Sequence, residues 1–125
     1  MIDELALPAH EELWARSSIF RDDRPWPDVR GMTMIIAEDG LASGYTMITA
    51  ARMVQRSGPS QIVAVVPTAS VSTIELLVFD LDLIVCHNVR TGYSFAVDDA
   101  YQNWRDLDRV EVINLLKSHG YISRK

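Results

Sequence analysis

The feature that most constrains how this chain can fold is the stretch MIIAEDGLASGYTM, which runs from Met34 to Met47. It joins a short apolar run, two adjacent carboxylates, a loop of small residues and a segment with helical spacing. A continuous apolar run followed by turn residues predicts a buried strand, here at residues 34–37. The loop glycines tolerate backbone angles that other residues resist, so the chain can turn tightly into the helix. A strand, a loop and a helix in this order are typical of α/β proteins.

The loop also carries groups that suit a small anion. Ser43 and Thr46 place hydroxyls beside backbone N–H groups at the expected N-terminus of the helix, which is its positive end. Small side chains, converging donors and a helix N-terminus together favour a phosphate-sized dianion. Glu38 and Asp39 would repel an anion, but they can accept hydrogen bonds from sugar hydroxyls. The alternative is an ordinary tight turn between a strand and a helix.

The rest of the chain continues to alternate between strand and helix. Apolar spacing and breaking residues predict a helix at 45–57, a strand at 61–66 ended by Pro67, a short helix capped by Ser70 or Ser72, a strand at 83–86, a strand at 93–97, and a last helix opened by Asp108 and Glu111. Strands joined through helices run parallel with right-handed crossovers, and their sites lie at the carboxyl ends of the strands. We therefore expect an α/β, Rossmann-like fold of three layers, with a parallel sheet flanked by helices. Residues 1–31 are expected to form a helix and linker that pack on the core, and residues 32–125 the α/β domain.

Composition excludes several kinds of partner. With 125 residues, 48% of them apolar and 23% charged, the chain has the make-up of an ordinary globular domain. A formal net charge of −5 argues against nucleic acid or an anionic membrane as a partner. The single Cys86 excludes an internal disulfide and fits a cytoplasmic protein. The three histidines share no ligand spacing, so we expect no metal site built from protein ligands alone.

The pattern of an apolar run, Glu-Asp, a small loop, Ser-Gly-x-Thr and a helix resembles the binding signature for phosphoribosyl diphosphate (PRPP) of type I phosphoribosyltransferases. The resemblance implies that Glu38 and Asp39 contact the ribose hydroxyls. It implies that the 5′-phosphate is bound by Ala42, Ser43, Gly44, Tyr45 and Thr46. Competing motifs fit worse, because a phosphate-binding Walker loop needs a lysine where Tyr45 stands and the dinucleotide fingerprint needs three spaced glycines.

The resemblance extends to the tract from Phe95 to Leu107. There it implies that Asp99 and Arg105 lie on the pyrophosphate side, one associated with magnesium and the other bound to pyrophosphate. It also implies that Mg²⁺ accompanies PRPP as a cofactor. The residues by themselves leave open a solvated pair at the start of a helix.

The likeness covers the C-terminal half of the family's fold, so the chain resembles a truncated member. The family's earlier strand, its pyrophosphate-gripping loop and its mobile loop find no match here. Whether the chain is an enzyme is therefore left open.

Three hypotheses about function follow. In the first, the chain binds PRPP, ribose 5-phosphate or a nucleotide, and transfer of the phosphoribosyl group to a base or related acceptor is weak or absent. In the second, a working transferase is completed by another chain, as a homo-oligomer or with a companion subunit. In the third, a non-catalytic interaction or regulatory subunit keeps the fold and pairs with another chain. For the binding hypotheses we expect Gly44→Val to weaken phosphate binding while the core stays folded.

Overall fold

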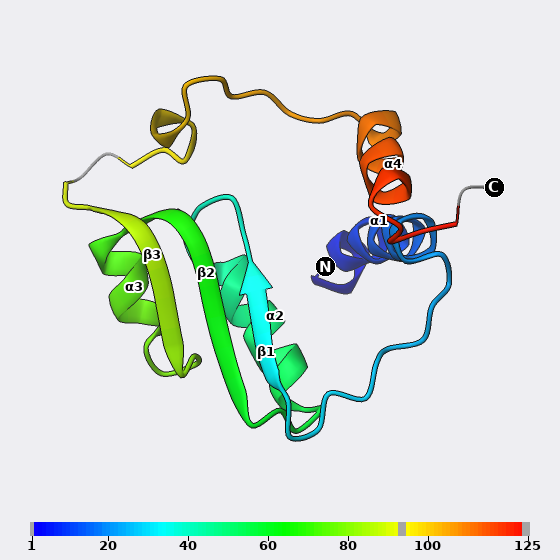
Figure 1. Ribbon diagram of the computed structural model, residues 1–125, viewed down its shortest axis with the longest axis horizontal. Coiled ribbons are helices and arrows are strands. Elements are labelled where there is room, and N and C mark those ends of the chain that lie inside the picture. Colours follow the sequence, from blue (N-terminus) through cyan, green and yellow to red (C-terminus); the bar gives the residue numbers. More distant parts are fainter. Residues whose placement is uncertain (1, 93–94, 124–125) are drawn as a thin grey trace. The chain divides into compact units, whose positions relative to one another are not determined.

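The computed structural model describes residues 2–92 and 95–123. By its internal contacts the chain divides into two units (Figure 1). One unit is Pro27–Trp104, and the other combines Met1–Trp26 with Arg105–Lys125. The candidate loop belongs to the unit Pro27–Trp104. The expected packing of residues 1–31 on the α/β core stays a prediction.

The unit Pro27–Trp104 contains a parallel sheet of three strands in the order β1-β2-β3. The strands are β1 (Thr33–Ala37), β2 (Gln61–Ser70) and β3 (Leu83–Arg90). Helix α2 (Tyr45–Gln55) connects the first two strands, and α3 (Val71–Leu77) connects the last two (Figure 1). This arrangement confirms the predicted α/β fold, in which helices flank a parallel sheet.

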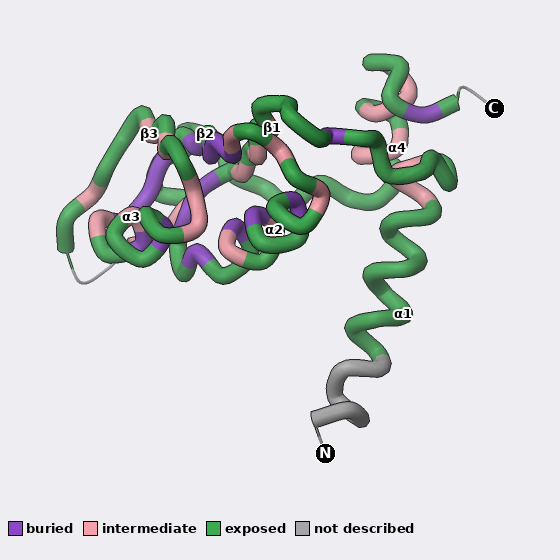
Figure 2. The backbone as a smooth tube through the Cα atoms, turned by 90° about the horizontal axis from the view of Figure 1, so that it is seen from below, coloured by how far each residue is buried: buried purple, intermediate pink, exposed green. Residues whose placement is uncertain are grey.

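Helices α2 and α3 lie on the same side of the strands (Figure 2). The strand order explains this, because successive right-handed crossovers that step in one direction across a sheet place their helices on one face. The core forms between that face and the helices, from Leu41, Met47, Ala64, Val66, Ala69 and Leu77. The opposite face carries apolar side chains that are exposed: Ile35, Val65, Leu83 and Val85. Within this unit the sheet therefore has one covered face and one open apolar face, so its described residues form two layers rather than the expected three.

Strand β2 continues through Pro67, where the sequence predicted its end. Its pairing with β3 passes from Val66 to Thr68 and skips the proline, which has no N–H to donate. Pairing with β1 has already ended at Ala37, so the proline interrupts no ladder there. The prediction was wrong because the partners of the later part of β2 come from distant parts of the chain.

The strand expected at 93–97 is not formed in its described part. Residues 93–94 lie outside the described residues, and Phe95–Val97 are not in a strand. A short 3-10 helix, η1 (Asp98–Ala100), follows them. Strand β3 is instead longer than expected, since it continues past Cys86 to Arg90.

The other unit contains two helices that contact each other, α1 (Ile2–Arg21) and α4 (Arg109–Ser118). Helix α4 begins with the predicted capping box. The Asp108 carboxylate accepts a hydrogen bond from the Glu111 N–H at 2.9 Å, and the Glu111 carboxylate accepts one from the Asp108 N–H at 3.0 Å. Among the described residues, no helix combines the length and the apolar character needed to cross a membrane.

Candidate functional site

The loop between β1 and α2 is attached through its middle to the end of β2. The buried Leu41 donates its N–H to the Thr68 carbonyl at 2.9 Å, and its own carbonyl accepts from the Ser70 N–H at 3.4 Å. These bonds make an isolated parallel bridge between Leu41 and Ala69. They provide a pairing partner for the part of β2 after Pro67, which the sequence did not predict to be a strand. They also hold the residues on both sides of Leu41 at the carboxyl ends of the strands.

Gly44 is the point at which the loop becomes helix α2. Its φ of 77° lies in the left-handed region that favours glycine. It is buried, and a Cβ at this position would lie 2.7 Å from Thr73 Cγ2, so a larger residue does not fit without a shift. As the N-cap, Gly44 provides no side-chain hydrogen bond to the helix. The N–H groups of the first turn therefore keep their capacity to donate to an anion.

The other residues predicted to bind phosphate are exposed around this turn: Ala42, Ser43, Tyr45 and Thr46. No acidic residue lies in the first turn of α2 to neutralise its positive end. The exposed hydroxyls of Ser43 and Thr46 flank the glycine. This part of the site is therefore open to solvent and has the donors that a phosphate group needs.

Two acidic residues precede the loop, and their surroundings differ. Glu38 is partly buried, and its Oε2 atom is inaccessible to solvent without a hydrogen-bond partner among the described residues. Burial, and then the negative charge of Asp39, raise the pKa of Glu38 above its ordinary value. Asp39 is exposed. A buried carboxylate oxygen without a partner is unfavourable, and a ligand hydroxyl reaches this Oε2 atom only if the side chain turns outward.

We expect Glu38→Gln to stabilise the free protein at neutral pH. A raised pKa means that the charged carboxylate is less favourable in the folded state, so the wild type loses stability as the pH rises through that pKa. Below the ordinary pKa of glutamate both side chains are neutral and the difference should vanish. Allowing for solvent screening, the gain is roughly 0.5 kcal/mol, or about 2–4 °C in Tm.

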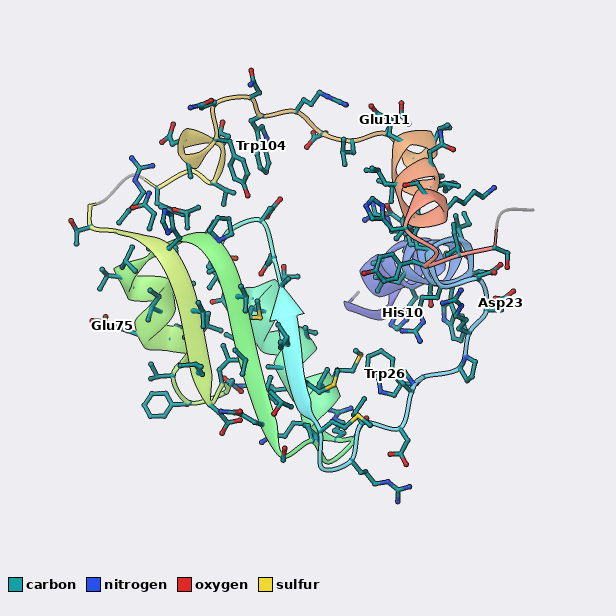
Figure 3. The ribbon with its side chains drawn as sticks, in the orientation of Figure 1. His10, Asp23, Trp26, Glu75, Trp104 and Glu111 are labelled. Atoms are coloured by element: carbon teal, nitrogen blue, oxygen red, sulfur yellow. The ribbon has the colours of Figure 1, made fainter. Side chains whose placement is uncertain are left out.

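Thermal denaturation between about pH 4 and pH 8 measures this difference. The exposed Glu75 of α3 provides a matched control, because Glu75→Gln makes the same change of charge away from the loop (Figure 3). A Glu38→Gln variant that is no more stable than the control at neutral pH would contradict the expectation.

The tract after β3 also contributes to this edge of the sheet. The Tyr101 hydroxyl donates a 2.7 Å hydrogen bond to the Asp39 backbone carbonyl. A Cβ at Gly40 would lie 2.6 Å from Val97 Cγ1, so the absence of a side chain there lets the tract approach. The Tyr101 and Trp104 rings lie 4.9 Å apart, and Trp104 lies near the carboxyl ends of the strands (Figure 3). Tyr101 and Val97 are residues of this edge that the sequence did not single out, since no local signal reports a bond to a residue 62 positions away.

Asp99 and Arg105 belong to different units of the structure. Asp99 faces Arg90 of the same unit, with a nitrogen-to-oxygen distance of 3.8 Å. Arg105 belongs to the other unit, where its guanidinium donates to both carboxylate oxygens of Glu111 at 2.8 and 2.6 Å. The hydrogen bonds that the Glu111 carboxylate accepts from Arg105, and then the one from the Asp108 N–H, lower the pKa of Glu111 to about 2. Figure 3 shows Glu111 in the first turn of α4. The role of Asp99 and Arg105 on a pyrophosphate side stays a prediction.

No family model matches the chain. Two curated proteins of Mycobacterium tuberculosis are similar in sequence, "Putative phosphoribosyl transferase MT0597" of strain CDC 1551 and "Putative phosphoribosyl transferase Rv0571c" of strain H37Rv. Each is 28% identical over 120 residues, which are 92% of this chain and 27% of the relative. The chain thus spans only about a quarter of the length of these curated relatives.

Solved structures are similar in fold. The crystal structure of TT1426 from Thermus thermophilus matches with a TM-score of 0.79 and 26% identity, over 93% of this chain and 55% of that one. The AQ2163 protein from Aquifex aeolicus matches with a TM-score of 0.50 and 24% identity, over 53% of this chain and 33% of that one, and shows the fold alone. By sequence, this chain is similar to proteins named as putative phosphoribosyl transferases, and its α/β fold fits a phosphoribosyltransferase-like fold.

Proposed function

We propose that the 38–46 loop binds a phosphorylated ribose, such as PRPP, ribose 5-phosphate or a nucleotide. One observation supports this most strongly. An acidic pair with an unpartnered carboxylate oxygen directly precedes a glycine turn that leaves the N-terminus of α2 without a side-chain cap. Acceptors for sugar hydroxyls and donors for a phosphate thus follow each other in a chain similar to proteins named as phosphoribosyl transferases.

The two parts of the ligand would be bound by different chemistry. The 5′-phosphate would accept hydrogen bonds from the N–H groups of residues 42–46 and from the hydroxyls of Ser43 and Thr46. The ribose hydroxyls would donate to Glu38 and Asp39, because carboxylates are strong acceptors that repel a phosphate. The ribose therefore lies on the side of β1, and the phosphate on the side of α2.

Transfer of the phosphoribosyl group to a base or related acceptor is the reaction that we propose for the assembled protein. Displacing pyrophosphate requires stabilisation of its developing negative charge. Among the described residues, no group of three or more His, Cys, Asp and Glu side chains could hold a metal ion. The proposed Mg²⁺ would take its oxygen ligands largely from the diphosphate.

Calorimetric titration of the chain with PRPP, ribose 5-phosphate and inorganic phosphate, each with and without Mg²⁺, tests the proposal. We expect the two sugar phosphates to bind in about the micromolar range and inorganic phosphate more weakly. No binding of either sugar phosphate would overturn the proposal. Equal affinity for ribose 5-phosphate and inorganic phosphate would contradict the role of the acidic pair.

We also propose that the chain associates with a second copy through the open edge or the adjoining face of its sheet. Among the described residues, strand β1 pairs only with β2, which leaves its outer edge without a partner strand. An apolar edge strand tends to pair with another chain. Ile35, on the open face, is 65% exposed. These features also favour the second candidate function, a non-catalytic subunit that pairs with another chain.

We expect sedimentation at micromolar concentration to show a dimer or a larger assembly, and Ile35→Lys to weaken it. Met53→Lys, which places the same charge at an exposed apolar residue of α2, is the control. A monomeric wild type would refute the proposal. If the assembly persists in Ile35→Lys and the amides of residues 33–37 exchange more slowly on association, the contact lies at the β1 edge.

A further inference from the structure

A buried threonine of helix α3 holds the loop on both sides of Ser43. Thr73 is 4% exposed. Its hydroxyl donates a hydrogen bond to the carbonyl oxygen of Ala42, the residue before Ser43. Its Cγ2 lies 2.7 Å from the position that a Cβ would take at Gly44, the residue after Ser43. Thr73 lies outside the sequence pattern of the loop, and the sequence shows no reason to connect it with Ser43.

The hydroxyl of Thr73 is the end of a chain of hydroxyl groups. Its oxygen lies 2.8 Å from Ser70 Oγ, and Ser70 Oγ lies 3.1 Å from Ser72 Oγ. Because Thr73 uses its one hydroxyl proton on Ala42, Ser70 must be the donor in the bond to Thr73. Ser70 has then used its own proton, so Ser72 donates to Ser70. Ser72 thus donates to Ser70, Ser70 to Thr73, and Thr73 to the Ala42 carbonyl. Hydrogen bonds in such a chain polarise one another, so each hydroxyl becomes a stronger donor.

A fixed carbonyl at Ala42 determines the direction of the next N–H group. The peptide bond between Ala42 and Ser43 is planar and trans, so its C=O and its N–H point in opposite directions. With the C=O directed at α3, the N–H of Ser43 is directed away from α3. Ala42 and Ser43 are both exposed, so this N–H can face a ligand in solvent.

We infer that Thr73 is a positioning residue, which orients the Ser43 N–H toward the phosphate of a bound sugar phosphate through its hydrogen bond to Ala42. This inference rests on the proposed function of the loop. It adds a residue of α3, 31 positions from Ala42, to the determinants of phosphate affinity.

Two substitutions separate the hydroxyl of Thr73 from its methyl group. Thr73→Val keeps the shape and the contact with Gly44 but removes the donor to Ala42. Thr73→Ser keeps the donor but removes the methyl group. We expect Thr73→Val to weaken ribose 5-phosphate binding about tenfold. We expect Thr73→Ser to bind within about twofold of the wild type, even though it unfolds at a lower temperature.

Calorimetry with ribose 5-phosphate, thermal denaturation and the amide NMR signal of Ser43 measure these effects. The Ser43 signal should move on addition of ligand to the wild type and to Thr73→Ser, and much less in Thr73→Val. Equal affinity of Thr73→Val and the wild type would overturn the inference, as would equal losses in both variants. A wild type that does not bind ribose 5-phosphate would instead overturn the proposed function.

A second variant keeps the test valid if Thr73→Val does not fold. Ser72→Ala removes the exposed first hydroxyl of the chain and leaves the Ser70 cap of α3 intact. We expect it to fold as the wild type does and to weaken binding by about twofold through loss of polarisation. If Ser72→Ala binds ribose 5-phosphate as the wild type does and its Ser43 amide signal has the wild-type position, the proposed polarisation along the chain of hydroxyls is contradicted.

Discussion

Replacing Gly44 by valine should destabilise the fold by about 2–5 kcal/mol and remove phosphate binding. A residue with a side chain at this φ of 77° loses about 1–2 kcal/mol. The new Cβ would lie 2.7 Å from Thr73 Cγ2, and overpacking of a buried site adds about 1–3 kcal/mol. The total is a large part of the stability of a small domain. The core is therefore expected to stay folded only with much reduced stability, because Gly44 is part of the contact between the loop and α3.

Alanine substitutions at Gly44 and Gly31 distinguish the cost of the contact with Thr73 from the cost of the backbone angle. Gly31 has a φ of 71°, close to that of Gly44, but a Cβ there would meet nothing within 4 Å. Gly31→Ala should therefore show only the cost of the backbone angle, about 1–2 kcal/mol. Urea denaturation of both variants measures the difference, and we expect Gly44→Ala to lose at least about 1 kcal/mol more. Equal losses would mean that the approach of Thr73 does not restrict this position.

Replacing Asp39 by asparagine should lower the affinity for PRPP about 10- to 100-fold, because hydrogen bonds to a charged acceptor contribute about 1.5–3 kcal/mol. Affinity for inorganic phosphate should stay equal or improve, since a negative charge near the loop is removed. The fold should persist, because the Asp39 side chain is exposed and Tyr101 binds its backbone carbonyl instead.

The matched control for this change is Asp28→Asn. Asp28 pairs with Arg30 before the start of β1, whereas Asp39 follows the end of that strand. Both changes remove one negative charge, so a general effect of net charge would appear in both variants. Equal loss of PRPP and of phosphate binding in Asp39→Asn alone would point to a role in folding rather than in sugar recognition. Calorimetry with each ligand distinguishes these outcomes.

The sequence by itself determined the order of the main elements and the place of the candidate loop. The apolar runs that follow Gln61 and begin at Leu83 predicted β2 and β3, and the pattern around Tyr45 predicted the start of α2. Ser70 caps α3 through its side chain, as one of the two predicted caps. These signals are readable because apolar spacing and helix caps act between residues a few positions apart.

Only the tertiary structure decided how far the strands extend and what the loop touches. β2 passes Pro67 because Leu41 pairs with its end, and Gly44 is buried because Thr73 packs on it. Arg105 bonds to Glu111 in a different unit from Asp99, which the linear order of residues does not reveal. The physical reason is common to all three. Contacts between distant residues depend on which side chains the finished fold brings together, and no local preference of the chain encodes that.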